Sequence, residues 1–347
     1  MNLLYYNLCL DKDYAPLEFN IEWLNQIALS YKNVFVITKY NNDLKFKKNI
    51  LVFPLLKYKE ENPSKISLLI RFYKFLFHIL FKYKIKRCFS HMNPLYIVLS
   101  GLILRLIKVK IILWYTHPAV TLKLKLAYFF SNKIVSASKE SFKYKKNKLL
   151  VLGHFVDDSI FTYNRKIIKS NEIVYAGRIS RIKNISYILK LFQSLDSKNS
   201  FKLILVGSCV TKRDLTYKNE LLKYIEYYNI SHLVRFIDFV KRDNLSVIFK
   251  NASYFINVTD KGSFDKVILE ASLCGAICLV SNDFLSNQLY GEDFTLTMDL
   301  KRDINTINKL IEFDLGAKNE LIKKQIEIVK KQYSIKNLSY RLDQAFS

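Results

Sequence analysis

The sequence predicts an α/β protein with two doubly wound, Rossmann-like parallel sheets in series. Apolar strands alternate with helical patterns in both halves of the chain, which is the rhythm of β-α-β units. Most of these strands are apolar along their whole length, as expected for parallel sheets that are covered on both faces. The chain has 347 residues, of which 50% are hydrophobic, and this is enough for two domains with separate cores.

The first domain is predicted to span residues 1–165. Its strand candidates are residues 2–6, 33–37, 49–53, 86–90, 109–114, 133–136 and 149–152. Helical patterns between these strands cover residues 16–30, 65–84, 94–107, 120–130 and 138–143. Pro94 fits the first turn of its helix, because a residue in that position needs no backbone N–H.

The second domain is predicted to span residues 166–315. Its strand candidates are residues 172–176, 202–206, 233–236, 253–257 and 277–280. Its helical patterns cover residues 184–196, 213–228, 243–250, 265–274 and 302–313. Residues 316–347 follow as C-terminal helices, which either stay on this domain or cross back to the first. Open α/β sheets bind ligands beyond the carboxyl ends of their strands, so two such domains predict a site in a cleft that both face.

The net charge of +25 is uneven along the chain. Residues 62–139 contain 14 lysines and arginines and no aspartate or glutamate. A general bias toward lysine does not remove acids from so long a stretch, so we expect a positive surface on the first domain. Its anionic partner is membrane lipid, phosphorylated lipid or nucleic acid. The five cysteines are scattered, which fits free thiols rather than a zinc site.

The helix predicted at residues 65–84 combines apolar side chains with a basic stripe. The stripe, at spacings of three and four residues, comprises Arg71, Lys74, His78 and Lys82. This helix either lies in a membrane interface with its cations on anionic lipid, or covers the sheet with a basic outer face. Its apolar stretch is shorter than the ~20 residues that span a bilayer. The N-terminus has no basic region before an apolar one, so no signal peptide is expected.

Two cations follow a predicted strand of the second domain. Gly177 and Arg178 come directly after the strand at 172–176, and Lys183 opens the next helix. A guanidinium fork and an ammonium suit phosphate oxygens, and a helix N-terminus also favours anions. The two cations therefore either grip a diphosphate or are simply solvated. Further residues that follow strands of this domain, and are expected at the same edge, are Gly207, Asp238 and Thr259.

A second motif places the acid Glu270 in an otherwise apolar helix. A buried carboxylate needs hydrogen-bond partners, which either a ribose diol or a neighbouring lysine can supply. The loop before the helix can form an anion-binding nest from backbone amides, and Asp265 either acts there or caps the helix. The loop and the first helical turn comprise Gly262, Ser263, Phe264, Asp265, Lys266 and Val267.

Together the two motifs resemble the donor-site motifs of glycosyltransferase family 4, which contains retaining, nucleotide-sugar-dependent enzymes with the GT-B fold. Gly177-Arg178 followed by Lys183 matches the diphosphate clamp of the family in sequence and spacing. Glu270 matches the second glutamate of its E-x7-E signature, which binds the nucleotide ribose. The resemblance is strong over residues 170–282 and implies a GT-B type architecture with the donor site at these residues.

The chain departs from the signature at its first glutamate, where Gly262 stands. In the family that glutamate usually contacts the donor sugar. The run from Gly262 to Lys266 resembles a subset in which a Gly-Ser-x-Asp-Lys loop replaces it. Sugar recognition is then expected to depend on backbone amides and on Asp265.

The first domain supplies candidates for catalysis and for acceptor binding. His117 follows the strand at 109–114, and the family carries a histidine in a comparable place near the reacting sugar. His117 is therefore the candidate catalytic residue, with a structural histidine as the alternative. Tyr115 and His91 also lie at strand ends and are candidates for the acceptor side. His154 lies in a stretch that resembles the interdomain turn of the family and is expected to be structural.

The resemblance and the charge together predict a retaining glycosyltransferase. It would move a sugar from a nucleotide sugar to a glycan or lipid-linked glycan acceptor, in the assembly of an envelope polysaccharide such as lipopolysaccharide, O-antigen or capsule. The expected location is cytoplasmic and peripheral, at the anionic inner face of the cytoplasmic membrane. Asp11-Lys12-Asp13 has the form of a metal-binding Asp-x-Asp run but occurs in a different fold, so no essential metal or other cofactor is expected.

Two other classes of protein stay open. One is another nucleotide-sugar enzyme of the GT-B type, such as an epimerase, which needs acid and base carboxylates in the cleft. The other is a basic nucleic-acid-binding protein, which the charge alone suggests. No nucleic-acid-binding module is recognisable in the sequence, so nucleic acid is not the expected partner.

Overall fold

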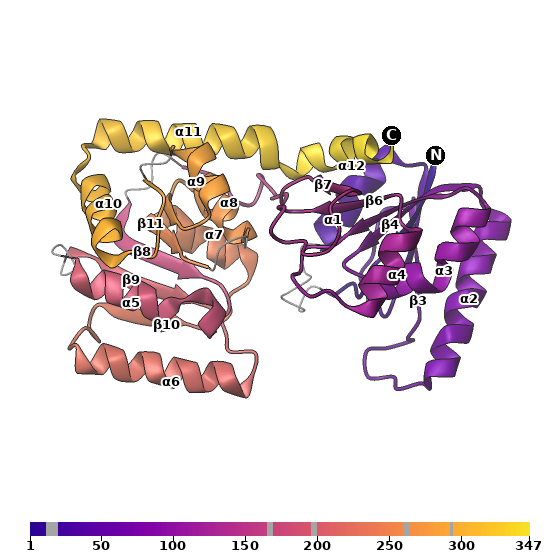
Figure 1. Cartoon of the computed structure of the whole chain (residues 1–347), viewed down its shortest axis with the longest axis horizontal. Helices are drawn as coiled ribbons and strands as arrows, with labels where there is room; N and C mark the ends of the chain where they lie inside the picture. Colours follow the sequence, from indigo (N-terminus) through magenta and orange to yellow (C-terminus); the bar gives the residue numbers. More distant parts are fainter. Residues whose placement is uncertain (12–19, 165–168, 196–199, 260–263, 292–293) are drawn as a thin grey trace. The chain divides into compact units, whose positions relative to one another are not determined.

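The chain forms two compact units in the computed structural model, shown in Figure 1. Unit 1 comprises Met1–Gly153 and Ile335–Ser347, and unit 2 comprises His154–Ser334. The predicted domain boundary at residue 165 thus falls later in the chain than this division. The structure describes residues 1–11, 20–164, 169–195, 200–259, 264–291 and 294–347.

Within the described residues, unit 1 has a sheet of seven parallel strands in the order β3-β2-β1-β4-β5-β6-β7. The strands are β1 (Asn2–Tyr6), β2 (Asn33–Thr38), β3 (Ile50–Pro54), β4 (Ile85–His91), β5 (Lys110–Trp114), β6 (Lys133–Ser136) and β7 (Leu149–Val151). The helices are α1 (Asn20–Ile27), α2 (Lys65–Lys82), α3 (Pro94–Leu106), α4 (Leu122–Phe130) and α12 (Leu338–Phe346). The seven predicted strands of this half are confirmed to within one residue at each end.

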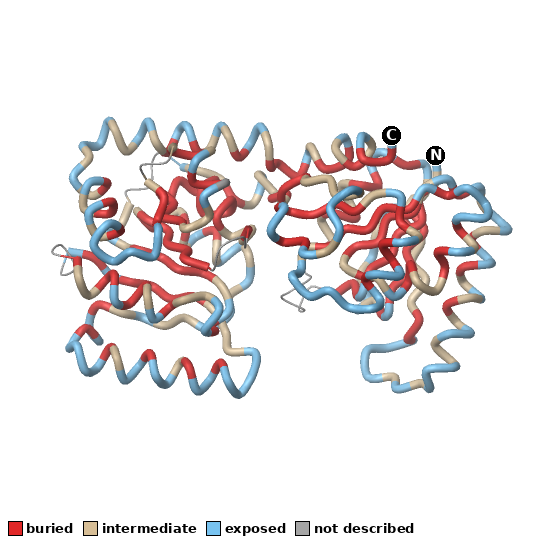
Figure 2. Tube along the Cα trace, viewed as in Figure 1, coloured by how far each residue is buried: buried red, intermediate tan, exposed pale blue. Residues whose placement is uncertain are grey.

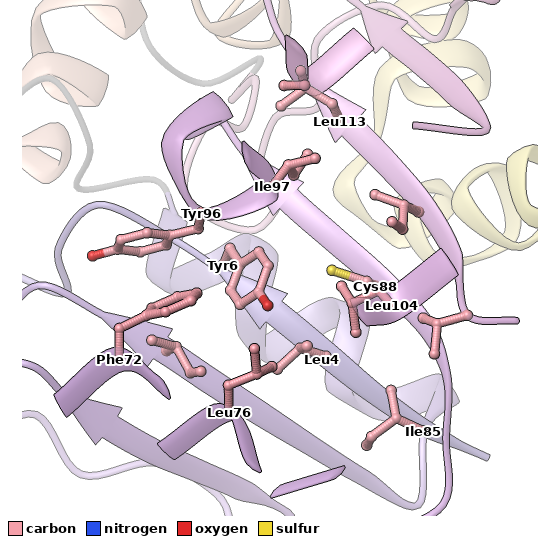
Figure 3. Close-up of a cluster of buried hydrophobic side chains, with 14 of the residues drawn as sticks. Leu4, Tyr6, Phe72, Leu76, Ile85, Cys88, Tyr96, Ile97, Leu104 and Leu113 are labelled. Atoms are coloured by element: carbon pink, nitrogen blue, oxygen red, sulfur yellow. The ribbon is translucent and has the colours of Figure 1, made fainter. Parts of the chain in front are cut away.

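Helices cover both faces of this sheet. Leu4 and Tyr6 of β1 point into a cluster with Phe72 of α2 and with residues of α3, as Figure 3 shows. Residues of α4 also belong to this cluster. Successive residues of a strand point to opposite faces. Trp114, which ends β5, accordingly packs on the other face against Trp23 of α1, with ring centroids 4.8 Å apart. Burial on both faces explains why these strands are apolar throughout, and Figure 2 shows them as the most buried part of the unit.

The last helix of the chain, α12, packs on unit 1. Asp343 forms an ion pair with Arg87, which lies near the start of β4, and accepts a hydrogen bond from Tyr31 at 3.1 Å. Lys110 Nζ, at the start of β5, donates to the backbone oxygen of Phe346 at 2.7 Å. The amino ends of the two strands therefore hold the end of the chain.

Unit 2 has, in the described residues, a parallel sheet of five strands in the order β10-β9-β8-β11-β12. The strands are β8 (Ser170–Ala176), β9 (Lys202–Val206), β10 (Val234–Ile237), β11 (Ala252–Asn257) and β12 (Ile277–Val280). The helices are α5 (Ile185–Ser194), α6 (Lys212–Tyr227), α7 (Arg242–Asn251), α8 (Lys266–Leu273), α9 (Asp283–Leu289), α10 (Leu300–Glu312) and α11 (Leu315–Tyr333). Two parallel, doubly wound sheets confirm the predicted fold class.

The structure corrects two predictions of secondary structure. Residues 138–143 form a turn and a bridge rather than a helix. The hydroxyl of Ser138 accepts the backbone N–H of Ser141 at 3.1 Å, and such local bonds compete with helix formation. Helix α9 was not predicted, although Asn282 caps it by accepting the N–H of Leu285 at 2.9 Å. No helix in the described parts of the chain is long and apolar enough to cross a membrane.

Close approach of α3 and α4 depends on Gly101. A methyl group on Gly101 would lie 2.5 Å from Cγ of Phe130, closer than carbon atoms can pack. We expect Gly101→Val to lower the free energy of unfolding by about 1–3 kcal/mol, the usual cost of overpacking. Leu102→Ala, on the exposed side of the same helix, is the matched control and should change it by no more than about 0.5 kcal/mol. Chemical denaturation of the full chain measures both, and equal effects would contradict the packing argument.

Candidate functional site

Two glycines end the neighbouring strands β8 and β9. Gly177 N donates to Val206 O and Gly207 N donates to Ile237 O, both at 2.9 Å. Their φ angles are 154° and 150°, a region that favours glycine. A Cβ on Gly207 would lie 1.8 Å from the carbonyl oxygen of Gly177, so no side chain fits between the two backbones. The carboxyl ends of β8 and β9 therefore present bare backbone, at the sheet edge where open α/β sheets bind ligands.

Arg178 is held by an acid that the sequence analysis did not identify. Its Nε and Nη2 donate to Asp214 Oδ2 at 3.0 and 2.8 Å. Asp214 is the third residue of α6 and forms a capping box with Thr211, whose N–H it accepts at 2.8 Å. Burial opposes the charge of Asp214, but Arg178 and the N–H donors outweigh it and hold the pKa of Asp214 below its usual value. The Thr-x-x-Asp spacing was the available signal for this residue.

Arg178 also borders a pocket of about 510 Å³. Its side chain is 44% exposed, so it can be reached from solvent. Arg181 and Arg213 line the same pocket, and Arg181 forms an ion pair with Glu220. Three guanidinium groups thus stand against the carboxylates of Asp214 and Glu220. This surplus of positive charge suits an anionic ligand.

Lys183 binds a different acid. Its Nζ lies 2.8 and 2.6 Å from the two carboxylate oxygens of Asp265. Asn257 and Thr259 each donate to Asp265 Oδ2 at 2.9 Å. Burial would raise the pKa of Asp265, but the charge of Lys183 and these hydrogen bonds lower it. Asp265 is the N-cap residue of α8, yet its side chain makes no capping bond, so its carboxylate serves Lys183 rather than the helix.

Glu270 lies one helical turn after Lys266 and is only 2% exposed. Its Oε1 lies 2.9 Å from Lys266 Nζ and 3.7 Å from Arg242 Nη2. The neighbouring lysine considered from the sequence is therefore one partner of Glu270. His154 lies close enough to Lys266, Asp265 and Glu270 to feel the charge of all three, so the two charged clusters of α8 adjoin.

His154 adjoins the same charged group. Its ring packs edge-on against Phe264, with centroids 5.4 Å apart. Burial and the charge of Lys266 lower the pKa of His154 to about 4, although Asp265 and Glu270 oppose this. The ring is therefore neutral at pH 7, which fits the structural role expected for it.

The structure does not gather all the predicted residues of unit 2. Arg178 and Lys183 hold different carboxylates rather than a common one. Asp238 ends the edge strand β10 with its side chain 84% exposed, 3.4 Å from Lys218 Nζ. Val267 is half-buried in the first turn of α8. Two further predicted residues, Gly262 and Ser263, lie outside the described residues.

The three candidates of unit 1 differ in exposure. His117 is exposed, and its Nδ1 accepts the N–H of Ala119 at 3.0 Å. Tyr115 is buried and donates to the oxygen of Ala119 at 3.0 Å, with its ring 6.3 Å from that of His117. His91 is 1% exposed, because β4 is a central strand and Trp23 of α1 packs against the His91 ring with centroids 5.2 Å apart. The assignment of His91 to the acceptor side stays a prediction.

In the part of the chain that the structure describes, no group of three or more His, Cys, Asp or Glu side chains is placed to hold a metal ion. Asp11 forms an ion pair with Lys59 at 3.0 Å. The rest of its Asp-x-Asp run lies outside the described residues.

Comparisons with known proteins find a matching family model and solved structures with a similar fold. The family model described as glycosyl transferases group 1 matches residues 158–332. Comparison with curated protein sequences found no match. The structure resembles that of Alr3699/HepE from Anabaena in complex with UDP, with a TM-score of 0.75, 14% identity and 99% of each chain covered. The same Anabaena protein has also been solved with UDP-glucose.

Two further solved structures are similar over nearly the whole chain. Sucrose-phosphate synthase from Thermosynechococcus elongatus gives a TM-score of 0.73 at 14% identity, with 100% of this chain and 98% of that chain covered. WaaG, a glycosyltransferase involved in lipopolysaccharide biosynthesis, gives 0.65 at 10% identity, with 99% of each chain covered. These likenesses show a shared fold, the GT-B architecture expected from the sequence.

We expect Gly207→Ala to destabilise unit 2 strongly, because its methyl group would meet the carbonyl oxygen of Gly177. The expected loss in the free energy of unfolding is on the order of 3 kcal/mol or more. Gly291→Ala is the matched control, since Gly291 has a φ of 92° but no atom within 4 Å of the added carbon. The control should cost only about 1–2 kcal/mol of backbone strain. Equal losses in denaturant melts of the two variants would show that the contact with Gly177 does not matter.

The lowered pKa of His154 predicts a pH dependence of stability. A histidine whose folded pKa is about 4 binds fewer protons than the unfolded chain below pH 6.5, so stability falls as the pH drops from 6.5 to 4. In His154→Gln, the loss of unfolding free energy between pH 6.5 and pH 4 should be smaller by about 1–3 kcal/mol. Unfolding free energies measured across that window test it, with the exposed His232→Gln as control. A decline as steep in His154→Gln as in the parent chain would refute the assignment.

Proposed function

Because the chain belongs to the glycosyl transferases group 1 family, we propose that it is a retaining glycosyltransferase of family 4 with a nucleotide sugar as its donor. The observation that carries this proposal is the edge of unit 2 at β8 and β9. There the bare backbone of Gly177 and Gly207 adjoins a pocket bordered by Arg178 and two further arginines. A diphosphate needs close backbone approach and cations together.

We assign Arg178 and Lys183 to the diphosphate, which would compete for them with Asp214 and Asp265. A guanidinium carries five N–H donors, and the contact with Asp214 uses Nε and Nη2. Arg178 can therefore offer donors to a phosphate while Asp214 keeps its orientation. Lys183 can turn its ammonium from Asp265 to a phosphate oxygen.

Glu270 is assigned to the nucleotide ribose. A carboxylate has about four lone-pair sites, so Glu270 can accept hydrogen bonds from a ribose diol while Lys266 stays on its Oε1. The loop with Gly262, Ser263 and Asp265 is assigned to the donor sugar. The Anabaena protein of the same fold was solved with UDP and with UDP-glucose, which makes UDP-sugars the first donors to test.

A retaining transfer of this kind needs a stabilised leaving group rather than a protein nucleophile. The acceptor hydroxyl attacks from the face that the diphosphate leaves, and Arg178 and Lys183 balance the charge that develops as the glycosidic bond breaks. On unit 1, His117 is assigned to the reacting sugar and the acceptor. Its Nδ1 accepts from Ala119, so the neutral ring carries its proton on Nε2, where it can donate to an oxygen. No metal or other cofactor is part of the proposal, because side-chain cations meet the diphosphate charge.

The proposed acceptor is a glycan or a lipid-linked glycan at the anionic inner face of the cytoplasmic membrane. The enzyme would act there as a peripheral protein in the assembly of an envelope polysaccharide. The absence of acids from residues 62–139 supports an anionic surface as partner. The fold of the lipopolysaccharide enzyme WaaG supports a role of this class.

Donor binding is tested by calorimetric titration and thermal shift with UDP and a panel of nucleotide sugars. UDP should stabilise the parent chain, by about 2.7 kcal/mol at 100 times its Kd. Arg178→Ala and Lys183→Ala should each weaken binding about tenfold or more, since each removes a charge-assisted contact. Matched controls are Arg235→Ala and Lys202→Ala, exposed cations of the same unit, which should bind UDP as the parent does. If Arg178→Ala and Lys183→Ala both bound UDP as tightly as the parent chain, the diphosphate assignment would be wrong.

Retention is tested separately, by assigning the anomeric configuration of the product with NMR. With an α-linked nucleotide sugar, the first product should carry an α-glycosidic bond. A β-linked product would refute the retaining mechanism and leave the donor site standing.

A further inference from the structure

The helical layer α2–α4 of unit 1 carries apolar side chains on its outer face. A helix that borders water usually carries polar side chains there. Eleven large apolar residues on these helices are exposed, and the most exposed are Phe81 at 86%, Leu106 at 74% and Phe129 at 73%. The eleven residues are Ile66, Leu69, Ile70, Phe77, Phe81, Leu95, Leu102, Leu106, Leu122, Leu126 and Phe129.

The exposed residues on each helix form a stripe on the side away from the core. On α4, Leu122, Leu126 and Phe129 are spaced i, i+4, i+7, whereas Leu124 and Ala127 are fully buried against the sheet. On α3 the stripe of Leu95, Leu102 and Leu106 likewise lies opposite the buried residues. Along α2 the stripe is reinforced by stacked rings. Tyr73 with Phe77, and Phe77 with Phe81, have centroids 6.0 and 5.9 Å apart.

The three stripes belong to one surface, which we call the outer apolar face and define by the eleven residues above. Tyr73 of α2 donates to the carbonyl oxygen of Leu99 in α3 at 2.9 Å, so α2 and α3 are neighbours. The close approach of α3 and α4 at Gly101 brings the third helix alongside. Figure 1 shows the three helices side by side. Scattered exposed apolar residues are ordinary, but a contiguous set of this size marks an interaction surface.

Cations flank this face. Lys74 and Lys82 on α2, Arg105 on α3, and Lys123 and Lys125 on α4 are exposed, and no acid occurs between residues 62 and 139. Positive charge around an apolar centre favours a partner that presents negative charge together with apolar groups.

The structure changes the basic stripe that the sequence predicted on α2. Arg71 donates to the carbonyl oxygen of Leu55 and to Glu61, both at 2.8 Å, so it is neutralised within the protein. Lys74, His78 and Lys82 remain exposed. Apolar side chains, flanked by lysines, therefore dominate the outer face of the layer.

We propose that the outer apolar face docks onto an anionic lipid bilayer. The apolar side chains would enter the boundary between headgroups and acyl chains, and the flanking lysines would meet lipid phosphates. A second copy of the chain fits this face poorly, because it would oppose two basic surfaces without a carboxylate between them. A nucleic acid would satisfy the cations but would leave the aliphatic stripes against phosphates. We rest this proposal on the proposed function in one respect, the use of a lipid-linked acceptor.

The test is flotation of the full chain with vesicles of phosphatidylcholine, alone or mixed with phosphatidylglycerol. The parent chain should float with the mixed vesicles. The triple variant Phe81→Gln, Leu106→Gln and Phe129→Gln, with one change on each helix, should lose about tenfold or more in vesicle binding. All three side chains are exposed, so the fold should persist. The matched control changes Val210, Tyr227 and Leu315 of unit 2 to Gln, which are 68%, 78% and 75% exposed, and should float like the parent.

A second arm reports insertion directly. In Phe129→Trp the new indole should shift its emission to the blue on anionic vesicles and be quenched by brominated lipid. Trp23 and Trp114 are 1% exposed and give a constant background. Changing Lys74, Lys82, Lys123 and Lys125 to Gln should weaken binding to the mixed vesicles, with the apolar stripes intact.

Three outcomes would overturn the proposal. They are undiminished flotation of the triple Gln variant, equal binding to neutral and anionic vesicles, and a parent dimer that the triple variant converts to monomer. UDP titration of the same preparations separates this proposal from the donor site. Lost flotation with normal UDP binding supports the docking surface alone, whereas normal flotation without UDP binding in the parent chain refutes only the donor assignment.

Discussion

The contact between the backbones of Gly177 and Gly207 is the constraint on which the site of unit 2 depends. Neighbouring parallel strands end at these two residues, and a Cβ at the second would meet the carbonyl oxygen of the first at 1.8 Å. Arg178 directly follows Gly177, and its side chain extends from the strand end to Asp214 at the start of α6. The same geometry leaves the carboxyl ends of the two strands without side chains at Gly177 and Gly207. This one steric restriction therefore accounts for the bare backbone at the strand ends and for the point from which Arg178 extends.

Each cation assigned to the diphosphate has a carboxylate of its own. Arg178 has Asp214, and Lys183 has Asp265. Unpaired, an ammonium that is only 18% exposed would be costly, so Asp265 keeps Lys183 in place without a ligand. A pyrophosphate carries more negative charge than one carboxylate and can therefore compete for these cations. In the proposed site, these pairs would keep the two cations in place until a strongly charged anion displaces the carboxylates.

Local pattern was enough to predict the strands, because burial on both faces makes them apolar throughout. The helix predicted at residues 138–143 does not form, and the reason is equally local. The hydroxyl of Ser138 accepts the backbone N–H of Ser141, a bond that competes with helix formation. The site was predicted only in part. Arg178, Lys183 and Glu270 stood out by spacing, but Asp214, Asn257 and Arg242 come from separate segments that only the fold brings near. The burial of His91 was not predicted, because its strand is central in the sheet, which the sequence does not show without strand order.

The return of α12 to the first sheet makes the amino-terminal unit discontinuous in sequence. Arg87 and Lys110, at the starts of β4 and β5, receive their contacts from Asp343 and Phe346 of α12. During synthesis, residues 1–153 emerge before unit 2 and α12 emerges after it, so these contacts close only once both have been made. The sheet and the other helices of the unit can form early, yet the unit is completed only when α12 has emerged. A nascent chain that stops short of α12 would leave those basic strand ends open.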